Sequence, residues 1–302
     1  MYQAKTPDTA LAAALIVTAT AFIAASTLLA KALGTGTFGP ALNPLQVSQG
    51  RFLFAWLAIL GAAAVVRPTM ERPHWGLHVA RTAFGWGGVS CMFAAVTFIP
   101  MSDATAISFL NPVFAMVLAI PLLGERVGRW RWTAAGLALL GAVILLRPTP
   151  ASFQPAALIA LAAAAVMGVE LILIKRLSRV EAPFQILIFN NSIGLVIATA
   201  AAVWVWQAPT AAQWAALAGV GIAMAMGQAC FVNGMARADA SFVAPFSYAT
   251  LIFAALYDAI FFGVRPDAVS LAGAAVILAG AVWLALREAR LKRGPAQSQP
   301  RL

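Results

Sequence analysis

The sequence predicts an all-α membrane protein with ten transmembrane helices. Of its 302 residues, 62% are hydrophobic and only 10% are charged. A soluble domain carries roughly 25% charged residues, so water could not solvate so large an apolar surface. Ten spanning helices of about 20 residues each would use roughly two thirds of the chain. The same composition disfavours a disordered chain, a secreted disulfide scaffold and a nucleic-acid-binding domain.

Apolar runs separated by Gly, Pro or charged residues mark the ten expected helices. A run of about 20 apolar residues is long enough to cross a bilayer, and the short connections predict antiparallel neighbours. The first run is too long for the apolar region of a signal peptide, so we expect it to be kept as a helix. The expected helices cover residues 9–33, 43–66, 74–98, 102–123, 130–147, 153–177, 182–205, 211–236, 240–263 and 267–287.

The basic residues predict how these helices are oriented. With loops alternating between the two sides, fifteen of the 20 Lys and Arg residues fall on one side and three on the other, and Arg51 and Arg81 lie inside helices. Cytoplasmic loops of membrane proteins collect Lys and Arg, so both termini are expected in the cytoplasm of a bacterial cell, beneath its inner membrane. This topology explains the net charge of +10 without a nucleic-acid partner.

Matching residues in a common order divide the chain into two similar halves. Lys31 ends the first expected helix as Lys175 ends the sixth, and Gly88 in the third corresponds to Gly227 in the eighth. Because each half holds five helices, an odd number, the second copy must cross the membrane in the opposite sense. Transporters use such inverted repeats, although a duplicated gene kept only as a stable bundle is the alternative. We expect one five-helix repeat at 1–149, the inverted repeat at 150–290 and a disordered cytoplasmic tail at 291–302.

The most specific motifs lie in the first half. They are Leu-Asn-Pro-Val-Phe at 110–114, Gly-Glu-Arg at 124–126, the glycines Gly136 and Gly141, Ser-Gln-Gly-Arg-Phe at 48–52, and Lys31. This pattern resembles the signature of the EamA family of the drug/metabolite transporter superfamily. The second half repeats it from Ala238 to Val282, with Val264 in the place of the usual Glu and Pro245 earlier than the usual proline. The resemblance implies ten helices around a cavity lined by the first, third, fourth, sixth, eighth and ninth.

The resemblance also implies a secondary carrier that works by alternating access. Within the superfamily the nearest likeness is with exporters of aromatic amino acids, so we expect export of amino acids, aromatic or otherwise apolar, and related metabolites. Exporters of drugs, nucleosides or other small metabolites of the same superfamily are the alternative. The expected partners are a small-molecule substrate and the lipid bilayer. The sequence contains no Gly-rich loop for nucleotide phosphates, so a nucleotide is not expected as a partner.

An integral membrane enzyme is the alternative from a different class. Such enzymes gather several acids, His or Cys residues, whereas the ten acids here are scattered along the chain. His74 and His78 have the spacing of half a metal site, but no further ligand is near them in the sequence. Cys91 and Cys230 lie in apolar runs and are expected as buried thiols. We therefore expect no catalytic residue, no metal site and no cofactor.

Two broken helices are the expected place for a substrate. Pro112 removes one helical hydrogen bond and crowds the carbonyl of Ser108, which predicts a kink, and Asn111 shares this face. The ninth expected helix offers three polar residues near the same depth: Ser247, Tyr248 and Thr250. Half-helices that meet near the midplane form the substrate sites of repeat-built transporters. The open alternative is that the prolines serve packing and the hydroxyls bond to their own helices.

The third expected helix carries a second polar face. His78, Arg81, Thr82 and Gly85 lie at i, i+3, i+4 and i+7, on one face. Trp86 of the same helix is one of the aromatic residues that could recognise an aromatic or apolar substrate by stacking and burial. Arg81 lies about 10 Å from the cytoplasmic end at the helical rise. It either extends to water, or pairs with Glu170 or with a substrate carboxylate. A carboxylate at the bilayer core costs on the order of 2.5–3.5 kcal/mol, so Glu170 should be paired or protonated.

Arg51 and Asp258 are expected in the outer third of the membrane, where they could neutralise each other. The pair would be either a structural ion pair or a gate that breaks during alternation. Glu170 and Asp258 are also the candidates for a proton relay. Facilitated export down a metabolite gradient is equally compatible with the sequence.

Overall fold

The structure is helical throughout the part of the chain that it describes. The computed structural model describes residues 9–68, 70–123, 129–146, 156–177, 180–235, 237, 246 and 249–292, and no strand occurs among them. Six helical segments are long and apolar enough to cross a membrane: 10–34, 44–66, 75–98, 156–174, 184–205 and 211–231. Two shorter apolar helices cover 249–262 and 268–280. The all-α membrane class is thus confirmed, whereas ten spanning helices stay a prediction.

The helices follow the expected segments closely. In chain order they are α1 (Thr9–Gly34), α2 (Pro44–Val66), α3 (Trp75–Phe98), α4 (Met101–Ser108), α5 (Asn111–Leu123), α6 (Arg129–Leu146), α7 (Ala156–Leu177), α8 (Pro183–Ala202), the 3-10 turn η1 (Val203–Val205), α9 (Ala211–Met235), α11 (Ala249–Phe262) and α12 (Ala268–Lys292). The fourth expected helix is divided into α4 and α5. Because α12 continues to Lys292, the expected disordered tail is wrong for 291 and 292, and its remainder lies outside the described residues.

Local sequence accounts for where α2 begins. Asn43 has extended backbone, and its side chain accepts a hydrogen bond from the Leu45 N–H at 3.0 Å. Pro44 occupies the first helical position, where the missing N–H costs nothing and the fixed φ suits a helix. Pro183 opens α8 in the same way. At its other end α2 stops at Arg67, which has a left-handed φ of 47°.

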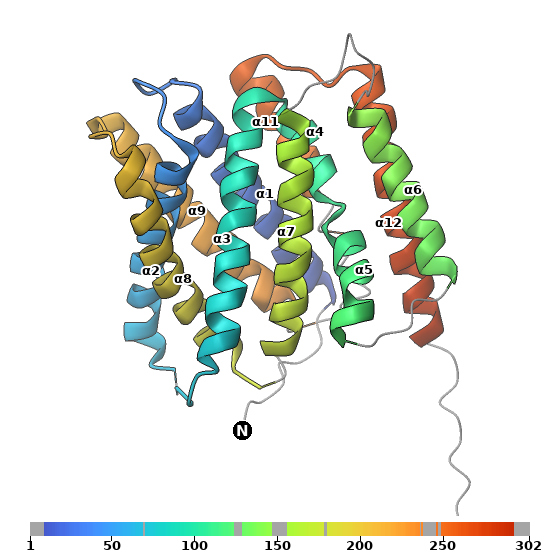
Figure 1. Ribbon diagram of the computed structural model, residues 1–302, viewed down its shortest axis with the longest axis horizontal. Coiled ribbons are helices and arrows are strands. Elements are labelled where there is room, and N and C mark those ends of the chain that lie inside the picture. Colours follow the sequence, from blue (N-terminus) through green and yellow to red (C-terminus); the bar gives the residue numbers. More distant parts are fainter. Residues whose placement is uncertain are drawn as a thin grey trace, which may run out of the picture.

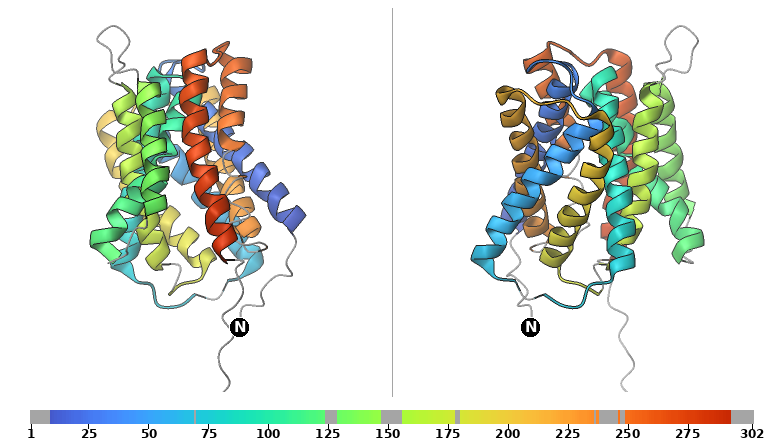
Figure 2. Two further views of the ribbon diagram at one scale, coloured as in Figure 1. Left: turned by 90° about the vertical axis from the view of Figure 1, so that its right-hand side faces the viewer. Right: turned by 60° about the vertical axis from the view of Figure 1, so that its left-hand side comes forward.

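The helices form one bundle in which segments distant in the sequence pair side by side. In Figure 1, α2 and α8 lie at the left edge and α6 and α12 at the right, with α3 and α7 between them. The most extensive contacts join α1 to α9, α3 to α7 and α6 to α12. In the left view of Figure 2, α6 and α12 lie side by side. We call the end where α1 ends and α4 begins, uppermost in Figure 1, the upper end, and the opposite end the lower end.

Glycines let two of these helix pairs approach closely. A Cβ atom on Gly88 of α3 would lie 2.5 Å from Met167 Cγ and 3.5 Å from the Ala163 carbonyl oxygen of α7. A Cβ on Gly227 of α9 would lie 3.2 Å from the Ala19 carbonyl oxygen of α1. Small residues at such contacts let helix backbones pack by van der Waals attraction, which drives helix association inside a bilayer.

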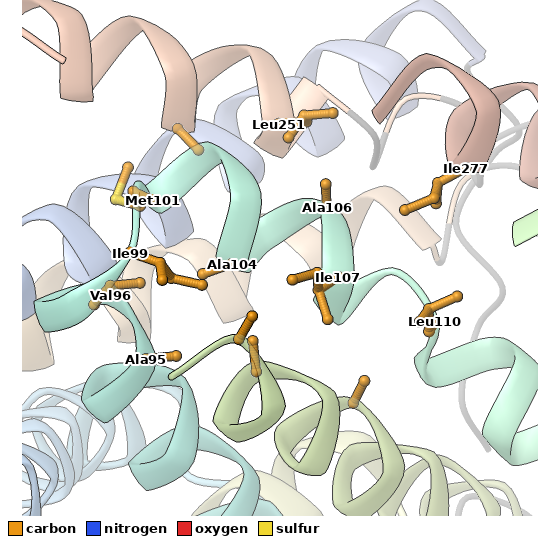
Figure 3. Packing of buried hydrophobic residues seen from close by; sticks show 14 of the residues in the cluster. Ala95, Val96, Ile99, Met101, Ala104, Ala106, Ile107, Leu110, Leu251 and Ile277 are labelled. Atoms are coloured by element: carbon orange, nitrogen blue, oxygen red, sulfur yellow. The ribbon is translucent and has the colours of Figure 1, made fainter. Parts of the chain in front are cut away.

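An apolar cluster packs the upper end of the bundle around the short helix α4. Met101, Ala104, Ala106 and Ile107 of α4 are at most 1% exposed. Figure 3 shows Leu251 of α11 and Ile277 of α12 beside this helix, with Ala95 and Val96 of α3, and Ile99 just after α3, below it. Because α4 is surrounded by other helices, its apolar side chains are buried at the upper end.

Candidate functional site

A buried ion pair joins α3 and α7 within the bundle. Arg81 Nη2 lies 3.2 Å from Glu170 Oε1, and the two side chains are 8% and 15% exposed. Of the alternatives left open for Arg81, the structure shows the pairing with Glu170. Gly85, one turn along α3, makes room for the carboxylate, since a Cβ there would lie 2.7 Å from Glu170 Oε1.

Arg51 of α2 brings a second guanidinium near this pair. It is 4% exposed, and its guanidinium carbon lies 4.3 Å from the centroid of the Phe52 ring. Glu170 is close enough to attract the Arg51 charge, and Arg81 is close enough to repel it. We call Arg51, Arg81 and Glu170 the charged cluster. It brings together three predicted site residues from three different helices.

Several hydrogen-bonding groups in and around the charged cluster have no partner among the described residues. They include Nε and Nη1 of both Arg51 and Arg81, which lie buried in the bundle. On α3, the Thr82 hydroxyl and Trp86 Nε1 are likewise buried without a hydrogen-bond partner. Buried polar groups are nearly always satisfied in native proteins, so unpaired donors mark a place where water or a ligand binds. The same atoms on α2 and α3 therefore outline a candidate binding site.

His78, which is predicted to bind substrate, contacts Glu181 and Phe189 in the structure. Its Nε2 lies 2.7 Å from Glu181 Oε2, and its ring packs 4.9 Å from the Phe189 ring of α8. His74 donates its backbone N–H to Glu181 Oε1 at 2.7 Å, and Gln185 donates to Glu181 Oε2 at 2.6 Å. This network ties the start of α3 to the loop between α7 and α8 at the lower end. No further ligand is near the two histidines in the sequence, but Glu181 is adjacent to both in space.

Glu181 is held as a carboxylate by this network. Burial raises its pKa, but the hydrogen bonds from the His74 N–H, the two imidazoles and Gln185 outweigh burial and lower the pKa from 4.5 to about 2. Its side chain is only 1% exposed. Within the described residues, no group of three His, Cys, Asp or Glu side chains is arranged to hold a metal ion.

Asp258 forms a second buried ion pair at the upper end. Lys31 Nζ lies 2.5 Å from Asp258 Oδ1, with side chains 8% and 1% exposed, and Asp258 Oδ2 accepts the Met101 N–H. Lys31 also lies 4.6 Å from the centroid of the Phe262 ring. The predicted pairing of Asp258 with Arg51 is wrong, because α11 packs against α1 and places Lys31 beside the carboxylate. This upper ion pair joins α1, α4 and α11.

The broken helix is confirmed, but its break precedes Pro112. Helix α4 ends at Ser108 and α5 begins at Asn111, so the two residues do not share one continuous helical face as expected. The Ser108 hydroxyl donates to the Thr105 carbonyl at 2.7 Å, which satisfies it within its own helix. The Asn111 carbonyl faces α7, where a Cβ on Gly168 would lie 3.0 Å away.

The predicted polar residues of the ninth helix are only partly described. Thr250 lies in the first turn of α11 and is partly buried. Ser247 and Tyr248 lie outside the described residues. Further along α11, Tyr257 borders an open groove of about 340 Å³ between α1 and α11, together with Val17, Thr18, Ala21, Phe22, Ala25 and Phe253. This groove is mostly apolar and does not include the charged cluster.

Sequence reasoning missed Lys31 and Glu181 as site-forming residues. Lys31 stands out in the sequence as a lone charge at the end of an apolar run, and that was the available signal. For Glu181 the signal was indirect, since His74 and His78 one turn apart required an acceptor that the local sequence does not supply.

Comparison with known proteins identifies relatives over nearly the whole chain. The sequence pattern of the EamA-like transporter family matches residues 10–147 and, a second time, residues 154–286. A riboflavin transporter of Rhizobium johnstonii is 32% identical over 254 residues, which are 81% of this chain and 80% of the relative. An S-adenosylmethionine uptake transporter of Rickettsia bellii is 25% identical over 265 residues, which are 87% of this chain and 89% of the relative.

Two further comparisons extend this picture. The pseudopaline exporter CntI of Pseudomonas aeruginosa is 25% identical over 206 residues, which are 68% of this chain and 71% of the relative. A solved crystal structure superposes with a TM-score of 0.63 at 22% identity, covering 91% of this chain and 98% of that one, and supports the fold alone. The expected likeness to aromatic amino-acid exporters stays a prediction.

Proposed function

Since the chain belongs to the EamA-like transporter family, we propose that it carries a small organic metabolite across a bacterial inner membrane by alternating access. Its relatives are transporters and not enzymes, and this chain is a multi-pass membrane protein of that kind. The relatives are named for riboflavin, S-adenosylmethionine and pseudopaline. These names favour the broader alternative of the sequence analysis, other small metabolites, over amino-acid export.

The proposed architecture is a pair of inverted repeats, and two glutamines support it. Gln46 near the start of α2 accepts the Gln207 N–H at 3.1 Å, just before α9. Gln185 near the start of α8 accepts the Glu71 N–H at 2.7 Å, just before α3. Each glutamine follows a proline by two positions, but the first contact lies at the upper end and the second at the lower end. A twofold axis in the membrane plane relates two such contacts.

The glycine contacts support the same axis. Ala163 follows Ala19 by the interval at which Lys175 follows Lys31, so the two alanines are equivalent in the proposed repeats. Gly88 packs on the carbonyl of Ala163, and its counterpart Gly227 packs on the carbonyl of Ala19. The pairing of α3 with α7 is thereby the counterpart of the pairing of α9 with α1.

In the proposed cycle the structure represents the state closed at the upper end. The apolar cluster around α4 and the Lys31–Asp258 pair seal this end. Opening it requires that α1 and α11 separate, which breaks the ion pair. The excess of Lys and Arg in the loops of the lower end supports a cytoplasmic location for that end and for both termini.

The charged cluster is the single observation that carries the proposed transport site. A bundle that needed only stability would gain little from two buried arginines and a glutamate, because apolar residues of similar volume serve as well or better. Ionisable residues inside membrane helices mark substrate and ion pathways. We assign the cluster to substrate binding, together with Thr82 and Trp86, whose polar atoms are unpaired in the described structure.

Counterflow in proteoliposomes tests this function. The panel is riboflavin, S-adenosylmethionine, phenylalanine and tryptophan, each labelled, with no ion gradient imposed. We expect saturable counterflow of at least one compound, lost in Arg81→Gln and kept in Arg265→Gln, a matched change at an exposed loop residue. Absence of counterflow for the whole panel, or equal transport by Arg81→Gln, would contradict the proposal.

A further inference from the structure

The charged cluster carries more positive than negative charge. Arg81 is paired with Glu170, but within the described part of the chain no carboxylate lies within ion-pair distance of Arg51. Arg51 is 4% exposed, so bulk water does not solvate its charge. A buried charge without a counter-charge is strongly unfavourable. The two guanidinium groups therefore face one carboxylate and lack one negative charge.

We propose that a carboxylate group of the transported metabolite supplies this charge by binding between Arg51 and Arg81. The inference rests on the proposed function and names the chemical class of its substrate: organic monocarboxylates. With the substrate bound, two guanidinium groups would face two carboxylates and the cluster would be neutral. Nothing in the names of the relatives assigns this role to either arginine.

The unpaired atoms match a carboxylate in number and kind. Nε and Nη1 of both arginines are N–H donors without acceptors in the described structure, and Trp86 Nε1 is a further one on α3. An ionised carboxylate donates nothing and accepts about four hydrogen bonds on its two oxygens. Hydrogen bonds from guanidinium to carboxylate are charge-assisted and about twice as strong as neutral ones. A neutral ligand would leave the excess charge of the cluster uncompensated.

Glu170 sets the net charge of this site and the orientation of Arg81. By holding Arg81 Nη2 at 3.2 Å, it orients the guanidinium and cancels one of the two positive charges. The cluster thus selects a monoanion, because a dianion would leave an unpaired negative charge in the bundle. It follows that Glu170→Gln should tighten the binding of a carboxylate and Arg51→Gln should weaken it.

The test compares ligands that differ only in the carboxylate. The purified full-length protein is titrated with three pairs: benzoate and benzamide, nicotinate and nicotinamide, and N-acetylphenylalanine and its amide. Ligand-induced thermal stabilisation gives the apparent Kd. We expect at least one carboxylate to bind ten times more tightly than its amide, and this preference to disappear in Arg51→Gln. Arg51→Lys, which keeps the charge, should retain part of it, and Arg265→Gln should behave as the unmodified protein.

Other results would overturn the inference in distinct ways. Equal binding of acids and amides, or an acid preference that survives in Arg51→Gln, removes Arg51 from the site. Saturation of the same stabilisation by chloride or phosphate shows an inorganic-anion site. Counterflow of riboflavin that is indifferent to Arg51→Gln refutes the carboxylate and leaves the carrier standing. Arg51-dependent carboxylate binding without any counterflow refutes the carrier and leaves the site.

Discussion

Replacing Asp258 by Asn should destabilise the protein and loosen its upper end. The carboxylate lies 2.5 Å from Lys31 Nζ, and its side chain is 1% exposed, so water cannot take its place. The amide oxygen of Asn can still accept the Met101 N–H, but the Lys31 ammonium loses its counter-charge. Lys31 is itself only 6% exposed, so water solvates little of its charge.

The size of the expected stability loss follows from the burial of this ion pair. Removing one partner of a buried ion pair costs about 3–5 kcal/mol, because the other charge stays buried and unpaired. An exposed pair would contribute only about 0–1 kcal/mol. Replacing both partners, as in Lys31→Met with Asp258→Asn, removes the unpaired charge. We therefore expect the double variant to recover most of the stability that the single variant loses.

Unfolding in mixed micelles with increasing SDS measures the free energy of unfolding of each variant. Glu71→Gln is the matched control, since it removes an exposed carboxylate in the loop before α3. Counterflow measured for the same variants distinguishes a gate from a purely structural ion pair. If the Lys31–Asp258 pair is a gate, Asp258→Asn changes transport by the protein that remains folded. If Asp258→Asn unfolds together with the unmodified protein, the ion pair contributes no stability and the reasoning from burial is refuted.

Three further changes test other contacts. In a double-mutant cycle, the variant with both Arg81→Gln and Glu170→Gln should be more stable, by about 0.5–3 kcal/mol, than the summed stability losses of the two single variants predict. Simple additivity of the two losses would mean that the pair is not coupled. The pKa of Glu181 is lowered from 4.5 to about 2, so the stability that this carboxylate contributes is complete above pH 4.5 and is lost as the pH falls toward 2. Glu181→Gln should therefore lower the thermal stability at neutral pH and make stability decline less steeply in acid. An unchanged decline in acid would exclude this network. Gly88→Val should lower the free energy of unfolding by about 1–3 kcal/mol, because the larger side chain overpacks against α7. Gly61→Val is the control, since a Cβ at Gly61 meets no atom within 4 Å, and it should leave the stability unchanged. Equal unfolding of the two variants would contradict the close approach of α3 and α7.

The helices were predictable because their signal is local. A run of apolar residues needs a bilayer or a core wherever it lies, and Gly, Pro and charges interrupt it in a recognisable way. The expected segments agree with the described helices to within a few residues at most ends. The break in the fourth helix was expected from Pro112 alone. The break itself lies before the proline, between Ser108 and Asn111, which counting from Pro112 does not give.

The partners of buried charges were predictable only in part. Arg81 and Glu170 were matched correctly by their depth in the membrane. The same reasoning paired Asp258 with Arg51, but α11 packs against α1 and places Lys31 beside Asp258. Depth along a helix follows from counting residues at 1.5 Å each, whereas neighbours around the bundle depend on which helices pack together.

The sequence by itself determined the membrane class, the helical segments, the family and the inventory of charges that the bundle must bury. Each of these follows from composition, from periodicity or from a motif confined to a short stretch of chain. The tertiary structure decided which charges meet: Lys31 with Asp258, His78 with Glu181, and Arg51 beside Arg81 and Glu170. The physical reason is that an ion pair acts over a few ångströms, and only the packing of helices brings residues so far apart in the chain within that range.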